Sequence, residues 1–139
     1  MMRRQHYLLD TNTNICIFYM KGRYNLDSVL TDKNKKYCHI SEITVAELLY
    51  GASCSDRKES VLRDVERFVG EFDVVPMFSS LRTYADIKAR LRSEGRLIDD
   101  FDLLIGATAL HNRMILVTEN IKHLSHIPDL TLENWIDRG

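Results

Sequence analysis

Three acidic residues, far apart in the chain, stand beside apolar runs. Asp10 ends one hydrophobic segment, Glu47 belongs to a helical pattern that starts at Ile43, and Asp102 directly precedes Leu103-Leu104-Ile105. Carboxylates at the ends of buried elements are typical ligands of a hard cation such as Mg²⁺ or Mn²⁺. Such a cation offsets phosphate charge and lowers the pKa of a bound water. The residue types therefore predict metal-dependent phosphate chemistry.

The elements that must position these acids alternate between strands and helices. Strands separated by helices predict a mostly parallel sheet covered on both faces, which is a three-layer α/β/α fold. With 139 residues and 45% hydrophobic content, the chain is expected to form one domain over residues 1–139. We expect strands at 6–9, 37–40, 72–75, 114–118 and 130–135, and helices at 13–20, within 24–36, and at 41–50, 56–68, 81–91 and 103–111.

Two glycines refine the predicted helices. Gly51 is expected to stop the helix that carries Glu47, and Gly106 is expected to let its helix pack closely on the sheet. Ser41 or Thr44 is expected to open the first of these helices, and Asp99 or Asp100 to cap the second. Glu47 and Asp102 are then expected near the starts of their helices, in the first turn.

A parallel sheet gives the acidic residues a common location. Ligands of open α/β sheets bind beyond the carboxyl ends of the strands, where Asp10 and the run from Thr118 to Asn120 are expected. The chain has no GxGxxG, GxxxxGK[ST] or GxSxG motif, so dinucleotide-binding, P-loop and hydrolase-elbow sites are excluded.

Composition limits how the chain could bind RNA and in which compartment it is expected. The net charge of -1 provides no overall basic field, so RNA contacts would have to use local Lys/Arg patches. No apolar stretch approaches the ~20 residues of a membrane span, and no signal-peptide core follows the basic N-terminus. Three cysteines without a CxxC pair favour reduced thiols. We expect a cytoplasmic protein with no membrane association.

The acidic residues belong to longer motifs that span nearly the whole chain. These are residues 8–12 (LLDTN), 43–52 (ITVAELLYGA), 102–110 (DLLIGATAL), 116–118 (LVT) and 132–135 (LENW). In order and spacing they resemble a PIN-domain ribonuclease, more narrowly a VapC-type toxin of a type II toxin-antitoxin system. The resemblance places the family's acids on Asp10, Glu47 and Asp102. Many members of the family carry a fourth acid, and here that position is occupied by Asn120. Asn120, Glu119 and Asp99 are therefore further candidate metal ligands.

The resemblance also implies an activity and partners. The activity would be a Mg²⁺- or Mn²⁺-dependent endoribonuclease that cuts structured RNA such as tRNA or rRNA and leaves a 5'-phosphate. The partner would be a VapB-like antitoxin that covers the metal site, contacts operator DNA and binds a toxin homodimer. Asn12 and Thr118 would organise the site. Candidates for RNA backbone contacts are Lys21, Arg23, Arg57, Lys58, Lys88, Arg92 and Arg96.

Each acid also has a structural interpretation. Thr44-x-x-Glu47 has the spacing of a capping box, and Asp10, Asp99 or Asp100 would cap a following helix. Asp102 would then be an acid in a helix's first turn, favoured by the helix dipole. On this interpretation the domain would be a catalytically weak PIN-like module that binds RNA or protein.

Two further hypotheses are weaker. A phosphotransferase with Asp10 as nucleophile would need a second aspartate at position 12, which is Asn12. His123 and His126 form an HxxH pair with no nearby Cys or His to complete a zinc site, and we interpret them as surface residues.

Overall fold

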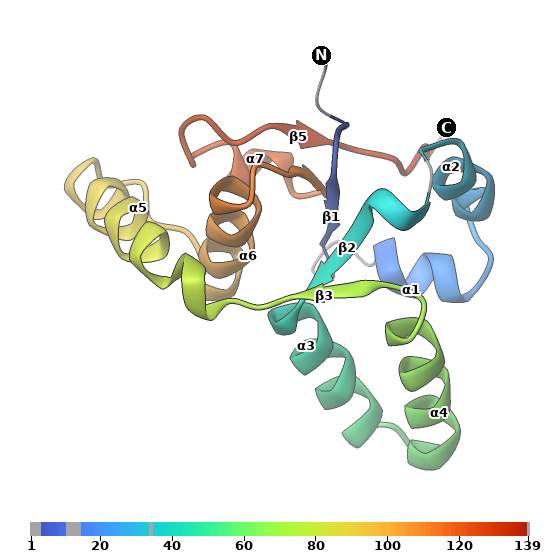
Figure 1. Cartoon of the computed structure of the whole chain (residues 1–139). Helices are drawn as coiled ribbons and strands as arrows, with labels where there is room; N and C mark the ends of the chain where they lie inside the picture. Colours follow the sequence, from blue (N-terminus) through green and yellow to red (C-terminus); the bar gives the residue numbers. More distant parts are fainter. Residues whose placement is uncertain (1–3, 11–14, 34, 139) are drawn as a thin grey trace.

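A parallel sheet forms the centre of the molecule (Figure 1). The computed structural model describes residues 4–10, 15–33 and 35–138. In these ranges five strands form one sheet in the order β3-β2-β1-β4-β5, and every pairing is parallel. The strands are β1 (Tyr7–Leu9), β2 (Cys38–Ser41), β3 (Asp73–Val75), β4 (Ile115–Val117) and β5 (Leu132–Glu133). The predicted fold class is confirmed, with strands one to four residues shorter than expected except for β2.

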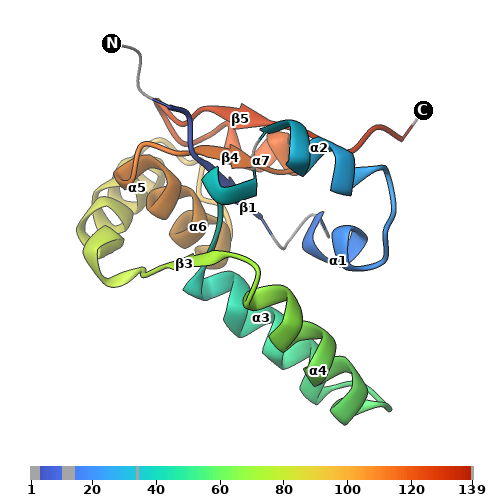
Figure 2. The same ribbon diagram turned by 45° about the vertical axis from the view of Figure 1, so that its right-hand side comes forward.

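Helices cover both faces of the sheet (Figures 1 and 2). On one face, α1 (Ile15–Met20), α2 (Leu26–Lys33), α3 (Glu42–Ser53) and α4 (Lys58–Val69) pack against Tyr7 and Leu9 of β1. On the other, α5 (Leu81–Ser93), α6 (Asp100–His111) and α7 (Ile121–Leu124) pack against Leu8. Successive strand side chains point to opposite faces, so the buried run of β1 serves two separate cores. Short 3₁₀ turns at Lys35–Tyr37 and Phe78–Ser80 complete the described elements.

Helix α3 is opened by Ser41 as predicted, but it ends later than predicted. It begins at Glu42, because Ser41 is the N-cap and its hydroxyl accepts a hydrogen bond from the Thr44 backbone N–H at 3.0 Å. It continues through Gly51 to Ser53. An interior glycine costs a helix only about 1 kcal/mol relative to alanine, and α3 lies alongside α4 over this stretch (Figure 2). The predicted stop at Gly51 and the capping box at Thr44 and Glu47 are therefore both wrong, and Glu47 lies in the second turn.

Helix α6 begins at Asp100, three residues earlier than predicted. Asp99 is its N-cap, since the carboxylate accepts from the Phe101 backbone N–H at 3.0 Å. Gly106 allows a close approach, but to the segment after α7 and not to the sheet. A Cβ built at Gly106 would lie 2.4 Å from Cδ1 of the buried Ile127. Gly106 therefore fixes the place of α7, a helix that the sequence did not predict.

No helix in the described ranges is both long and apolar enough to cross a membrane.

Candidate functional site

Asp10 lies at the carboxyl edge of the sheet, directly after β1. Its backbone N–H donates to the Val117 carbonyl at 3.0 Å, so the pairing of β1 with β4 extends to this residue. The Asp10 side chain is wholly buried, and the Thr118 hydroxyl donates to its Oδ2 at 2.8 Å. Because β1 and β4 are neighbours, residues 108 positions apart meet here, as the prediction of a common edge requires.

Asn120 connects this pair to Asp102. The Asn120 backbone N–H donates to the Thr118 hydroxyl oxygen at 2.9 Å, and its Nδ2 donates to Asp102 Oδ2 at 3.2 Å. Asp102 lies in the first turn of α6 with only 6% of its surface exposed, where the helix dipole favours negative charge. Thr118 and Asn120 thus join the two buried carboxylates, Asp10 and Asp102.

Glu47 approaches the same edge from α3 and is half-buried. The position of Glu47 is indicated by its effect on Cys16, which lies in α1. Burial raises the pKa of the Cys16 thiol far above its ordinary value, and the negative charges of Asp10 and then Glu47 raise it further. Both carboxylates therefore act on one fully buried sulfur. In residues 4–10, 15–33 and 35–138, no three His, Cys, Asp or Glu side chains already form a group that could hold a metal ion.

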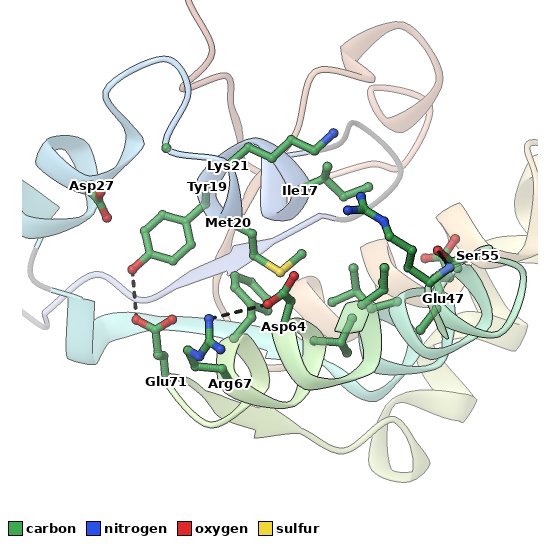
Figure 3. Close-up of a pocket in the computed structure, with 18 residues that line it drawn as sticks. Ile17, Tyr19, Met20, Lys21, Asp27, Glu47, Ser55, Asp64, Arg67 and Glu71 are labelled. Carbon is green, nitrogen blue, oxygen red and sulfur yellow. Dashed lines mark hydrogen bonds and ion pairs between the residues drawn. The ribbon is translucent and has the colours of Figure 1, made fainter. Parts of the chain in front are cut away.

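A cavity of about 850 Å³ opens beside Glu47, between α1 and the α3–α4 pair. Figure 3 shows Glu47 and Ser55 at one end and Tyr19 and Glu71 at the other. Tyr19 donates its hydroxyl to Glu71 at 3.1 Å, and Lys35 pairs with the same carboxylate. The apolar side chains that line the cavity are Ile17, Met20, Leu48, Val61, Val65 and Phe68. This cavity was not predicted from the sequence, although the predicted helix at 56–68 forms part of its wall.

The alternative acidic ligands have other contacts. Glu119 accepts two hydrogen bonds from Arg138, at 2.6 Å from Nε and 2.8 Å from the terminal nitrogen. These bonds lower the pKa of Glu119. Asp99 is exposed, and its carboxylate caps the N-terminus of α6. Asn12 lies outside the described residues, so its expected organising role is not visible, whereas Thr118 contacts Asp10 directly.

The candidate RNA-binding side chains fall into separate groups. Lys21 and Arg57 line the cavity that Glu47 borders. Lys88 instead pairs with Asp100 at 2.8 Å, which ties α5 to α6. Arg96 lies 3.6 Å from Glu94. Lys21 and Arg57 thus share a cavity with Glu47, whereas Lys88 and Arg96 lie near other acidic side chains.

The sequence analysis placed His123 on the surface without a role. The ring is exposed, but its Nδ1 lies 3.0 Å from Asn120 Oδ1. His126, the second histidine of the HxxH pair, lies with Nδ1 2.9 Å from the Arg96 carbonyl oxygen instead. The available signal was the position of His123, three residues after Asn120 and thus one helical turn away.

Comparison with known proteins identifies the family. The sequence model of the PIN domain matches residues 7–130. The chain is 36% identical over 135 residues to Ribonuclease VapC2 of Rickettsia felis, covering 93% of this chain and 97% of the relative. The chain belongs to the VapC family of PIN-domain ribonucleases. A second VapC relative is a tRNA(fMet)-specific endonuclease of Shigella flexneri, 34% identical, with 93% of this chain and 97% of the relative covered.

A solved VapC structure agrees with this assignment. The structure of DNA-bound VapBC from Salmonella typhimurium matches with a TM-score of 0.86 and 30% identity, over 94% of this chain and 98% of that one. The predicted VapC resemblance and endoribonuclease activity as a toxin are confirmed. PIN nucleases typically depend on a metal. The phosphotransferase hypothesis is therefore wrong, and a module that only binds is no longer the preferred interpretation.

Proposed function

We propose that Asp10, Glu47 and Asp102 hold a Mg²⁺ or Mn²⁺ ion at which the chain cuts structured RNA. One observation carries this proposal: two buried carboxylates, Asp10 and Asp102, are joined through Thr118 and Asn120 at the carboxyl edge of the sheet. Burying ionised carboxylates is costly unless they are paired or coordinate a metal. Helix capping does not account for Asp102 or Glu47, because Asp99 caps α6 and Ser41 caps α3.

The residues fit such a cation in charge and donor type. All three side chains offer carboxylate oxygens, the ligands of hard divalent ions, in contrast to the thiolate and imidazole sites of zinc. Mg²⁺ is usually held by one or two carboxylates and keeps several waters, and Asp10 and Asp102 are two buried carboxylates at one edge of the sheet. When bound, the ion would offset phosphodiester charge and lower the pKa of an attacking water.

The chain's own residues divide the remaining work. Thr118 fixes one oxygen of Asp10 and Asn120 fixes one oxygen of Asp102. Lys21 and Arg57, at the cavity beside Glu47, are suited to binding RNA phosphates on either side of the cut. Positioning of this kind is most of what a phosphodiester cleavage needs from the protein.

The relatives suggest the substrate and the partners. The Shigella flexneri relative is named for tRNA(fMet), which makes this tRNA the first substrate to test, followed by other tRNAs and rRNA. The DNA-bound VapBC structure supports a VapB-like antitoxin as partner and a complex that binds DNA. We infer that this antitoxin covers the acidic residues, contacts operator DNA itself and binds a homodimer of this chain. We place the reaction in the cytoplasm, where these RNAs are, and assign it to a single PIN domain over residues 1–139.

The test compares cleavage by matched variants. Antitoxin-free protein is incubated with tRNA(fMet), total tRNA and rRNA in Mg²⁺ or Mn²⁺, with an EDTA control, and new RNA ends are mapped. Asp102→Asn is paired with Asp100→Asn, because both acids lie in the first turn of α6 but only Asp102 is buried against Asn120. We expect discrete cuts with 5'-phosphate ends that disappear with EDTA, Asp10→Asn and Asp102→Asn but persist with Asp100→Asn. Cleavage by folded Asp102→Asn at the wild-type rate would refute the proposed site. RNA that is bound but never cut would favour a binding module.

A further inference from the structure

Asn120 stands between a carboxylate and an imidazole. Its Nδ2 lies 3.2 Å from Asp102 Oδ2, and its Oδ1 lies 3.0 Å from His123 Nδ1. The two ends of a side-chain amide differ, since the nitrogen only donates and the oxygen only accepts. The amide nitrogen is the end that faces Asp102, and it donates to Oδ2. The amide oxygen then faces His123, whose Nδ1 must carry the hydrogen that completes the second bond.

The backbone leaves the Asn120 side chain available for this task. Asn120 is the N-cap of α7, and its carbonyl accepts from the Leu124 N–H at 3.1 Å, yet its side chain makes no capping bond. An N-cap asparagine ordinarily bonds to the first helical N–H groups. Here it turns to Asp102 and His123 instead. His123 is held in place through α7, whose Leu124 is buried and which packs near Gly106.

We propose that His123 is a positioning residue for the nuclease. Its Nδ1–H keeps the Asn120 amide oriented so that Asn120 donates to Asp102 and its oxygen stays away from the metal ligands. This inference rests on the proposed function. It makes Asn120 an organiser of the site and not a ligand, in contrast to the acid that many PIN domains carry at this position.

The same arrangement limits the site to one divalent ion. With Asn120 donating, the carboxylate ligands left among the described residues of the site are those of Asp10, Glu47 and Asp102. The nearest alternatives are engaged, because Glu119 is held by Arg138 and Asp99 caps α6. Three carboxylates outweigh the charge of one divalent ion, fall short of the charge of two, and leave few oxygens for a second ion. We therefore expect a stoichiometry of one Mn²⁺ per chain.

Removing the imidazole releases the amide. In His123→Leu nothing at residue 123 fixes Asn120 Oδ1, so the amide can rotate and leave Asp102 without its oriented donor. Residues that orient metal ligands from the second shell typically change metal affinity or activity by about 10–100-fold. We expect a loss of this size in Mn²⁺ affinity and in kcat, with KM for RNA little changed. His123→Asn should restore function, since its amide nitrogen can donate from near the position of Nδ1.

The experiment needs one control and two measurements besides activity. His126→Leu is the matched control, because His126 belongs to the same HxxH pair but contacts the Arg96 carbonyl and not Asn120. Mn²⁺ affinity and stoichiometry are measured by calorimetry on the full chain for all three variants. The ring ¹⁵N chemical shifts of His123 in metal-free wild type report whether Nδ1 carries a hydrogen. This measurement needs no variant, so the test stands even if His123→Leu folds poorly.

The outcomes separate this inference from the proposed function. A protonated Nδ1, weakened Mn²⁺ binding in His123→Leu alone and recovery in His123→Asn would support it. A bare Nδ1, a second Mn²⁺ per chain, or His123→Leu indistinguishable from His126→Leu would overturn it while wild type still binds metal and cuts RNA. Wild type that neither binds Mn²⁺ nor cuts RNA would refute the proposed function itself.

Discussion

Replacing Thr118 by valine should destabilise the metal-free fold by about 2–4 kcal/mol, because it removes two buried hydrogen bonds without changing the side chain's shape. The Thr118 hydroxyl donates to Asp10 Oδ2 at 2.8 Å and accepts from the Asn120 N–H at 2.9 Å. Thr118 is 1% exposed and Asp10 is fully buried, so bulk water does not reach the contact. Valine leaves both partners in place but provides neither a donor nor an acceptor.

The size of the effect follows from the charge on Asp10. A hydrogen bond to a charged group contributes about 1.5–3 kcal/mol and a neutral one about 0.5–1.5 kcal/mol. Their sum, reduced slightly because a methyl group is easier to bury than a hydroxyl, gives the expected range. Thr118→Ser is the matched control: it keeps the hydroxyl and loses one methyl group, which costs about 0.8 kcal/mol.

Urea unfolding in EDTA measures this prediction through a double-mutant cycle. Wild type, Thr118→Val, Asp10→Asn and the double variant are compared, with Thr118→Ser alongside. When position 10 is neutral, the cost of valine should fall by about 1–1.5 kcal/mol, the difference between a charged and a neutral acceptor. An equal cost of valine in both backgrounds, or a larger cost for serine than for valine, would refute the reasoning.

Three further changes test individual contacts. Asp99→Ala should lower stability in urea by about 1 kcal/mol through loss of the α6 cap, and calorimetry should show unchanged Mn²⁺ affinity; weaker binding would make Asp99 a ligand. Burial lowers the pKa of His39, and the neighbouring His6 lowers it further. As pH falls, His39 therefore binds a proton in the unfolded chain at a higher pH than in the folded one. The folded state loses stability as pH falls below about 6.5, the ordinary pKa of histidine. His39→Gln should flatten that slope in urea titrations, and an unchanged slope would assign it elsewhere. Gly106→Ala should lower the Tm, because overpacking against Ile127 by about 1–3 kcal/mol exceeds the helix gain of about 1; a raised Tm would contradict this.

Local pattern predicted the order of elements well and their boundaries less well. Short apolar segments ended by polar residues located all five strands. The signal is clearest for β1 and β4, which are buried along their whole length, as parallel strands covered on both faces are. The error at Gly51 has a different origin. A glycine favours a helix end, but whether the helix stops there depends on what lies beside it, and α3 lies beside α4. The α7 helix, four residues long, is too short to show a periodic pattern.

The sequence placed the carboxylates of the proposed site at one edge of the sheet, and the resemblance named Thr118 as an organiser, but neither gave the individual contacts. Asp10 and Asp102 could be placed at one edge because ends of parallel strands share an edge. Which strands are neighbours is set by the whole sheet, so the contact between Thr118 and Asp10 was not readable from spacing. The pairing of Glu119 with Arg138 depends on the path of the C-terminal segment. The orientation of Asn120 depends on a histidine that sequence alone left without a partner.

Compared with an aspartate at position 120, Asn120 should lower metal affinity and make the metal-free protein more stable. Asp10 and Asp102 are both buried, and like charges in a buried site raise each other's cost of ionisation. An aspartate at position 120 would add a third charge near them, whereas the amide donates to Asp102. Asn120→Asp should therefore unfold at lower urea concentration in EDTA but bind Mn²⁺ more tightly.

Added Mn²⁺ should then stabilise Asn120→Asp more than wild type, because a ligand that binds only the folded state adds RT ln(1 + [L]/Kd). Urea unfolding at several Mn²⁺ concentrations would show the two stability curves crossing. Asn120→Ala serves as the control, since it removes the donor without adding charge and should lose both stability and metal affinity. If Asn120→Asp were instead more stable than wild type in EDTA, charge repulsion would not be what the amide relieves, and the donor role of Asn120 would have to be abandoned.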